Sequence, residues 1–150
     1  MEQGTIQGIK ANDHRILSRV ITRIENDDYV QDQRFIELYD QAQKAIRLGI
    51  TGPPGAGKST ITNELIKRFL KNNQTIGVIA IDPSSPFSGG ALLGDRVRMN
   101  HYNNDKSVFI RSMGTHGSLG GLARKTQEAG DILAASGKDV IIFETVGVGQ

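Results

Sequence analysis

The residues best suited to chemistry lie together in the segment GPPGAGKST at positions 52–60. This segment fits the pattern G-x-x-x-x-G-K-[ST], with Gly52, Gly57, Lys58 and Ser59 at the defining positions. A strand is expected before it and a helix after it, which is the context that the pattern requires. The segment therefore predicts a P-loop that binds the phosphates of a nucleotide through Gly52, Pro53, Pro54, Gly55, Ala56, Gly57, Lys58, Ser59 and Thr60.

Each residue type in this segment has a physical role. Gly55 and Gly57 permit backbone conformations that a side chain would forbid, so amide groups can approach a phosphate. Those amides and the start of the helix form a site for an anion. Lys58, the first catalytic candidate, is expected to reach the β- and γ-phosphate oxygens. The hydroxyl of Ser59 is expected to coordinate Mg²⁺, and Thr60 can donate to the α-phosphate.

Three acidic residues stand where the carboxyl ends of parallel strands are expected. Asp82 and Glu144 each follow a strand that is apolar on both faces, and Asp95 lies in the loop between them. Because ligands bind at the carboxyl ends of such strands, these acids are predicted to hold Mg²⁺ together with Ser59. Asp95 is a second catalytic candidate, although it also suits the N-cap of a short helix. Gly147 could offer its N–H to the γ-phosphate.

Other loop residues admit two interpretations. Arg96 and Arg98 could stabilise charge during phosphoryl transfer, or they could be solvated helix charges. His116, in the glycine-rich segment 114–121, could donate a proton or lie exposed in the loop. The segment TVGVGQ at 145–150 suits a switch that changes conformation with the γ-phosphate.

Alternating apolar patterns predict the elements that position these residues. Strands are expected at Ile46–Thr51, Thr75–Ile81, Ser107–Arg111 and Asp139–Phe143, and helices at Lys58–Asn72, Asp95–Tyr102 and Leu122–Ala135. Buried strands separated by helices indicate parallel pairing with helices on both faces. The predicted fold class is α/β, a P-loop three-layer sandwich with a mostly parallel sheet and an N-terminal helical extension.

The first 47 residues differ from the rest in composition and in the spacing of their apolar residues. They contain no proline, and their apolar residues repeat at helical spacing in two stretches, Ile16–Ile24 and Phe35–Ala45. Asn12 or Asp13 is the expected N-cap of the first helix. Residues 1–47 are therefore predicted to form a helical extension, and 48–150 the nucleotide-binding domain. The helices could pack on that domain, serve as a partner-binding arm, or do both.

Composition narrows the functional classes. Lys plus Arg is 18 and Asp plus Glu is 16, so the net charge of +2 gives no basis for nucleic-acid binding. The chain has no cysteine, which excludes disulfides and thiolate metal sites. No apolar run approaches the ~20 residues of a membrane helix. A cytoplasmic protein with no membrane or nucleic-acid partner is expected.

Four segments together resemble a known family. GPPGAGKST (52–60), IDPSSPFSGGALLGDRVRM (81–99), GSLGGLAR (117–124) and FETVGVGQ (143–150) are similar to the MeaB/ArgK family of P-loop GTPases. The human member of that family is the methylmalonic aciduria type A protein. The resemblance also covers the N-terminal helical segment, and reaches roughly from residue 8 to residue 150.

The resemblance implies more than the P-loop does. It implies GTP and GDP as ligands, Mg²⁺ as the metal, and a homodimer at full length. It also implies a GTPase chaperone that gates cofactor loading and protects an adenosylcobalamin-dependent acyl-CoA mutase, usually methylmalonyl-CoA mutase. Lys58 and Ser59 match the family's P-loop pair, and Asp82, Asp95 and Glu144 match its acidic positions near Mg²⁺. An older family label is a transport-associated ATPase.

One departure from the family pattern leaves alternatives open. Members are longer than this chain, and the guanine-reading N/T-K-x-D motif does not occur in the 150 residues. The chain is thus expected to be a fragment or a truncated relative, with an unpaired sheet edge and a tendency to self-associate. A nucleotide-binding module without turnover, a nickel-insertion GTPase and a small-molecule kinase are the alternative functions. The absence of cysteine argues against nickel insertion.

Overall fold

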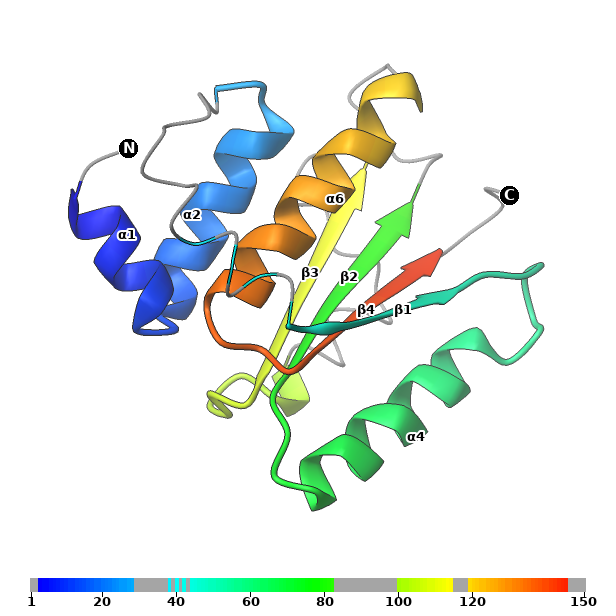
Figure 1. The fold of residues 1–150 in the computed structure, drawn as a ribbon. Helices are drawn as coiled ribbons and strands as arrows, with labels where there is room; N and C mark the ends of the chain where they lie inside the picture. Colours follow the sequence, from blue (N-terminus) through cyan, green and yellow to red (C-terminus); the bar gives the residue numbers. More distant parts are fainter. Residues whose placement is uncertain are drawn as a thin grey trace.

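A computed structural model describes residues 3–28, 38, 40, 42, 44–82, 100–114 and 119–145. The elements within these ranges follow one another along the chain as two helices and then alternating strands and helices (Figure 1). Their bounds are α1 (Gln3–Lys10), α2 (His14–Glu25), β1 (Ile46–Ile50), α4 (Lys58–Lys71), β2 (Ile76–Asp82), β3 (Val108–Gly114), α6 (Leu119–Ala135) and β4 (Val140–Thr145).

The four described strands form one parallel sheet in the order β1-β4-β2-β3. The two central strands are buried on both faces, as their continuous apolar sequences predict. Because all the strand pairs are parallel, every strand directs its carboxyl end toward the same edge of the sheet. β1 and β3 are the outer strands of the described sheet, and Ile46 at the start of β1 is 51% exposed. The predicted α/β class and parallel pairing are confirmed.

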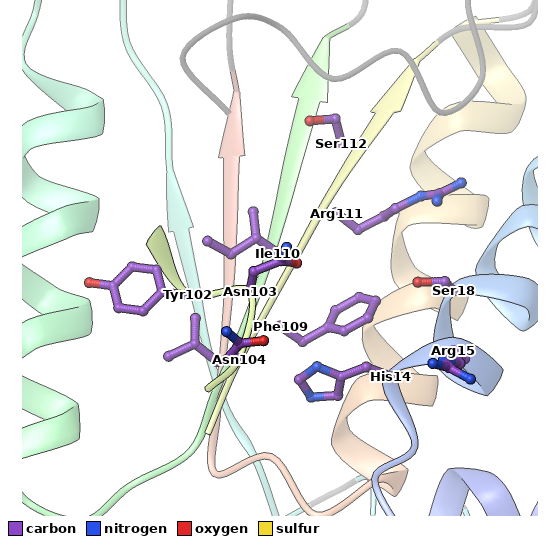
Figure 2. A pocket seen from close by; sticks show the side chains of 11 residues that line it. His14, Arg15, Ser18, Tyr102, Asn103, Asn104, Phe109, Ile110, Arg111 and Ser112 are labelled. Atoms are coloured by element: carbon purple, nitrogen blue, oxygen red, sulfur yellow. The ribbon is translucent and has the colours of Figure 1, made fainter. Parts of the chain in front are cut away.

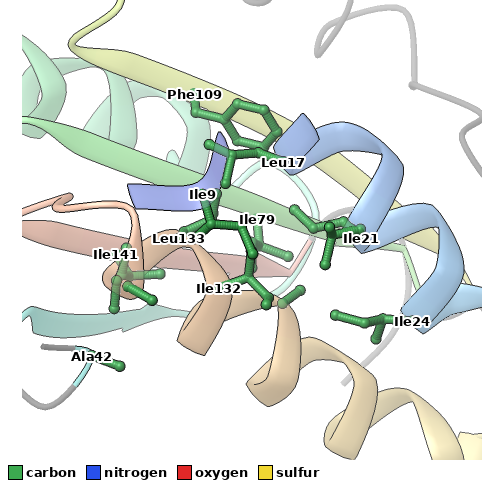
Figure 3. Close-up of a cluster of buried hydrophobic side chains, with 14 of the residues drawn as sticks. Ile9, Leu17, Ile21, Ile24, Ala42, Ile79, Phe109, Ile132, Leu133 and Ile141 are labelled. Atoms are coloured by element: carbon green, nitrogen blue, oxygen red, sulfur yellow. The ribbon is translucent and has the colours of Figure 1, made fainter. Parts of the chain in front are cut away.

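Helices cover both faces of the sheet and make three layers (Figure 1). One face packs against α4, around Ile66, Val78 and Ile142. The other face packs against α6 and α2, which lie beside each other, and α1 contacts both of these helices. Figure 3 shows this second core, to which α2 contributes Leu17 and Ile21 and α6 contributes Ile132. The N-terminal helices are thus part of the main hydrophobic core.

The start of α2 follows the predicted capping. Asp13 is the N-cap, and its Oδ1 accepts hydrogen bonds from the backbone N–H groups of Arg15 at 2.9 Å and Ile16 at 3.3 Å. The preceding helix α1 was not predicted from the sequence. An added Cβ at Gly8 would lie 2.0 Å from Cδ1 of Ile16, so Gly8 lets the two helices approach closely. Of the predicted helix at Phe35–Ala45, the described residues Leu38, Asp40 and Ala42 are helical.

Two predicted boundaries were wrong by three residues, and β4 ends two residues later than predicted, at Thr145. β3 continues past Arg111 to Gly114, because its last residues stay paired with β2 through Asp82. α6 begins at Leu119 rather than Leu122, so the end of the glycine-rich segment 114–121 belongs to the helix. β3 is longer than its local sequence predicts because pairing with β2 extends it.

Several sequence predictions fall outside the described residues. They concern Asp95, Arg96, Arg98, His116 and Gly147. No helix in the described part of the chain is long and apolar enough to cross a membrane.

Candidate nucleotide phosphate site

The P-loop joins the end of β1 to the start of α4, as the motif predicts. Gly55 and Gly57 have φ of 77° and 88°, in the left-handed region that favours glycine. Gly57 is the N-cap of α4 and offers no side chain to its first turn. An added Cβ at either glycine would meet nothing within 4 Å. The requirement for glycine here is therefore conformational, and the open loop leaves its amides accessible.

Lys58 folds back over the loop. Its Nζ donates hydrogen bonds to the backbone oxygens of Gly52 at 2.7 Å and Pro53 at 2.9 Å. These contacts place the ammonium group over the loop, whose amides and helix start already favour an anion. The positive charge of Lys58 and the backbone N–H groups of the loop therefore lie where they could contact the same anionic ligand.

Ser59 connects the first turn of α4 to the end of β4. Its Oγ donates a hydrogen bond of 2.9 Å to Oε1 of Glu144, which is fully buried. The two residues are 85 positions apart, and the convergence of strand ends brings them together. A hydroxyl and a carboxylate in contact are hard oxygen ligands of the kind that Mg²⁺ accepts.

Asp82 lies on the same side of the sheet as Glu144. In the parallel register Ala80 is opposite Glu144, and Asp82 is two residues beyond Ala80 on the same strand face. That face is the one covered by α4. Asp82 is 7% exposed and has interactions of its own. The structure thus puts two of the three predicted acids beside the start of α4.

The oxygen atoms of Ser59, Glu144 and Asp82 suit a metal ion that would also bind oxygen atoms of a ligand. No group of three His, Cys, Asp or Glu side chains in the described ranges could hold a metal ion. Mg²⁺ usually binds through one or two carboxylates plus phosphate oxygens and waters. Ser59 and Glu144 fit that pattern, with Asp82 as the next carboxylate along the edge.

One contact at this edge was missed by sequence reasoning. The hydroxyl of Thr145 donates to the hydroxyl of Thr51 at 3.2 Å, and so joins the ends of β4 and β1. Both threonines flank predicted site residues, but a hydroxyl pair across two strands leaves no pattern in the sequence. The contact adds to the backbone pairing of Ile50 with Glu144, which sets the spacing between the start of the P-loop and Glu144.

Comparison with known proteins decides the family. The sequence model described as "Methylmalonyl Co-A mutase-associated GTPase MeaB" matches residues 17–150. The chain belongs to the MeaB family. This membership confirms the resemblance that the four sequence segments indicated.

Relatives from three distant organisms agree with this membership. A protein of Pyrococcus abyssi named "Putative GTPase" is 54% identical over 97% of this chain and 45% of its own length. GTPase ArgK of Escherichia coli is 36% identical over 97% of this chain and 45% of its own length. The mitochondrial methylmalonic aciduria type A homolog of Mus musculus is 45% identical over 79% of this chain and 29% of its own length. The chain spans less than half the length of these relatives.

A solved structure has the same fold. The crystal structure titled "LAO/AO transport system kinase" superposes with a TM-score of 0.70 and 25% sequence identity. The match covers 99% of this chain and 45% of the other. The three-layer arrangement of this MeaB-family chain is therefore that of a P-loop NTPase.

Proposed function

We propose that the protein is a Mg²⁺-dependent GTP hydrolase. The observation that carries the proposal is the contact between Ser59 of the P-loop and the buried Glu144 at the end of the neighbouring strand. This contact brings the P-loop next to a carboxylate that would bind Mg²⁺ in this proposal, as hydrolysis of a nucleoside triphosphate by P-loop proteins uses a metal held beside the loop. The family name and the GTPase names of its relatives support guanine as the base.

In this proposal, the chain's own residues position and neutralise the triphosphate. The loop amides and the start of α4 bind the β-phosphate, and Lys58 exchanges its two carbonyl partners for β- and γ-phosphate oxygens. Ser59, Glu144 and Asp82 hold Mg²⁺, which supplies charge neutralisation when bound. Water attacks the γ-phosphorus, and the bond to the β,γ-bridging oxygen breaks to give GDP and phosphate.

Two residues outside the described ranges belong to the same proposal. Asp95 would add a carboxylate to the metal, and Gly147 would donate its N–H to the γ-phosphate. The role of Asp95 follows from the family resemblance, and that of Gly147 from its position three residues after Glu144. Removing the γ-phosphate would release Gly147, which gives the chain a means of signalling its nucleotide state.

We further propose an adenosylcobalamin-dependent acyl-CoA mutase as the partner of the full-length protein. The matching family is described as mutase-associated, and the mouse relative is named for methylmalonic aciduria. The role would be that of a chaperone that gates cofactor loading and protects the mutase. A homodimer at full length belongs to the same proposal.

The hydrolase proposal is tested by GTP turnover. Lys58→Ala is expected to reduce turnover about a hundredfold or more, because a positioned charge at the phosphates is lost. Lys67→Ala is the matched control, since Lys67 lies exposed on the same helix and pairs with Glu64. Equal turnover in Lys58→Ala and Lys67→Ala would contradict the proposal. Binding of GTP without turnover in the unaltered protein would favour the binding-module alternative.

The partner proposal needs its own assay. Purified methylmalonyl-CoA mutase with adenosylcobalamin should raise the GTP turnover of the full-length protein, and the Lys58→Ala protein should show no such rise. An unchanged turnover and an unchanged rate of cofactor transfer to the mutase would refute the mutase role. The hydrolase proposal would stand in that case.

A further inference from the structure

A groove of about 630 Å³ lies beside the last turns of α4. One wall is the part of the helix that carries Arg68 and Lys71, and the other is the segment with His101 and Tyr102. Figure 1 shows α4 running from the P-loop toward the amino ends of the strands. Arg68 comes ten residues after Lys58, or about 15 Å along the axis of an α-helix. The groove is therefore separate from the phosphate site, although one helix reaches both.

Two positive charges in this groove are uncommitted. Arg68 and Lys71 are exposed, and their side chains make no hydrogen bond or ion pair in the described part of the chain. The neighbouring Lys67 is instead paired with Glu64, with 2.7 Å between Nζ and Oε1. Because residues three apart lie side by side on a helix, Arg68 and Lys71 can meet the same charged ligand.

Between these charges the groove has an apolar and aromatic lining. Leu70 and Tyr102 are partly buried against the core on the α4 face of the sheet. The rings of His101 and Tyr102 meet edge to face with their centroids 4.8 Å apart, which restricts how Tyr102 lies. In Figure 2 the ring of Tyr102 lies on the α4 side of β3, opposite His14 of α2. Tyrosine and arginine beside an apolar surface are typical of the energetically important residues of protein interfaces.

From this combination we propose that the groove binds an acidic segment of a protein partner. Carboxylates of the segment form charge-assisted hydrogen bonds with Arg68 and Lys71. An apolar side chain of the segment covers Leu70 and Tyr102, so that charges surround an apolar centre as in other protein interfaces. This interaction surface does not depend on the proposed hydrolase activity.

A protein segment fits the groove better than a phosphate group or a nucleic acid. Phosphate sites are built from converging backbone N–H groups, whereas here the positive groups are exposed side chains with the carboxylate of Glu64 beside them. Nucleic acids bind to cations that are spread along many phosphates, and the net charge of this chain is only +2. A protein segment can match both the cations and the apolar lining.

Peptide binding to the unaltered 150-residue protein tests the proposal, in about 0.15 M salt so that weak surface attraction is screened. The probe is a fluorescein-labelled twelve-residue peptide that repeats Glu-Glu-Leu, and two further peptides repeat Glu-Glu-Ser and Lys-Lys-Leu. Fluorescence anisotropy should show saturable binding of the Glu-Glu-Leu peptide and none of the Lys-Lys-Leu peptide. The Glu-Glu-Ser peptide should bind about fivefold more weakly, because its apolar contact is lost.

Three results would overturn the proposal. The first is an absence of saturable binding by the Glu-Glu-Leu peptide. The second is equal binding of the Glu-Glu-Leu and Glu-Glu-Ser peptides, which would mean simple anion binding. The third is tighter binding of a fluorescein-labelled ten-nucleotide oligouridylate, which would assign the groove to nucleic acid.

Two variants assign the binding to the groove. Arg68→Glu should weaken binding of the Glu-Glu-Leu peptide about tenfold, because a carboxylate replaces an uncommitted cation. Glu64→Gln should instead strengthen binding about threefold, because it removes the carboxylate beside the cations. Arg19→Glu is the control, since Arg19 is exposed on α2 and is not among the described residues that line the groove. Equal affinities of Arg68→Glu and Arg19→Glu, or weaker binding by Glu64→Gln, would overturn the assignment.

Discussion

Two regions of the molecule are held together in different ways. One is the P-loop edge, where the strands end beside the start of α4. The other is the helical side, the face of the sheet that α2 and α6 cover. Around the P-loop the chain is open to solvent, and its shape depends on glycine conformations and a few short contacts. Beneath α2 and α6, charged side chains are buried and paired across long stretches of sequence. The comparison indicates that ligand chemistry and fold stability are assigned to separate regions.

The helical side depends on a network of ion pairs. Arg111 of β3 bonds to Glu25 and Thr22 of α2, and Glu25 is 1% exposed. Lys125 of α6 donates to the backbone oxygen of Glu25 and to Asp27. Since buried charges are costly unless paired, α2 is held in place against the sheet and α6.

The largest expected effect is therefore on stability, from Arg111→Ala. It leaves the carboxylate of Glu25 buried without its main partner, and should cost about 3–5 kcal/mol in the free energy of unfolding. Urea denaturation followed by circular dichroism measures the loss. The double variant Arg111→Met with Glu25→Met should recover much of it. A loss below about 1 kcal/mol for Arg111→Ala would mean that the pair does not hold α2.

At the P-loop, Gly57→Ala is expected to change GDP affinity more than the stability of the fold. A left-handed conformation costs a non-glycine residue roughly 1–2 kcal/mol, so the loop should distort and GDP affinity should fall about tenfold. Because the Cβ meets no other atom within 4 Å, the cost should stay local. Calorimetry with GDP checks this, with Gly4→Ala as the control in α1. Unaltered GDP affinity would show that this conformation is not needed.

A smaller effect is expected from Asp13→Ala at the start of α2. It removes two hydrogen bonds to the first turn of the helix and should cost about 1 kcal/mol of stability. GDP affinity should not change, since α2 does not contact the P-loop in any described hydrogen bond. A fall in both stability and GDP affinity would couple the two regions and contradict their separation.

The last prediction is a pH dependence centred on Lys138. Burial lowers its pKa to about 8, against the opposing influence of Asp105 and Asp139. The unfolded chain holds this proton up to about 10.5, so between pH 8 and 10.5 the unfolded state binds more protons. Stability contributed by this group must therefore rise with pH across that window. The difference in unfolding free energy between the unaltered protein and Lys138→Met should show the rise, and a flat difference would contradict it.

Sequence reasoning predicted the P-loop edge well and the helical side poorly. Residues 52–60 are contiguous, and Gly57, Lys58 and Ser59 have the types that the motif requires. The contact between Ser59 and Glu144 spans 85 residues, yet it follows from parallel strands that end at one edge. No comparable rule pairs Arg111 with Glu25 across 86 residues. A charged residue within a predicted strand indicated only that some partner had to exist.

Helix α1 shows the same limit. Its eight residues contain two glycines and only two large apolar side chains, so its local propensity for helix is weak. The helix is stabilised by tertiary packing, with Ile9 buried in the core and Gly8 against Ile16. Such packing can be recognised once α2 and α6 are in place, and not from the segment alone.

We propose that the P-loop and Glu144 together bind a Mg²⁺-nucleotide. Calorimetry of GDP binding, with Mg²⁺ present and with Mg²⁺ removed by chelation, is the most direct test in the unaltered protein and in Ser59→Ala. Chelation should weaken GDP binding by the unaltered protein about tenfold or more, equivalent to ~1.4 kcal/mol. Ser59→Ala should show the weaker affinity under both conditions. Tight GDP binding by Ser59→Ala with an undiminished response to Mg²⁺ would contradict the claim.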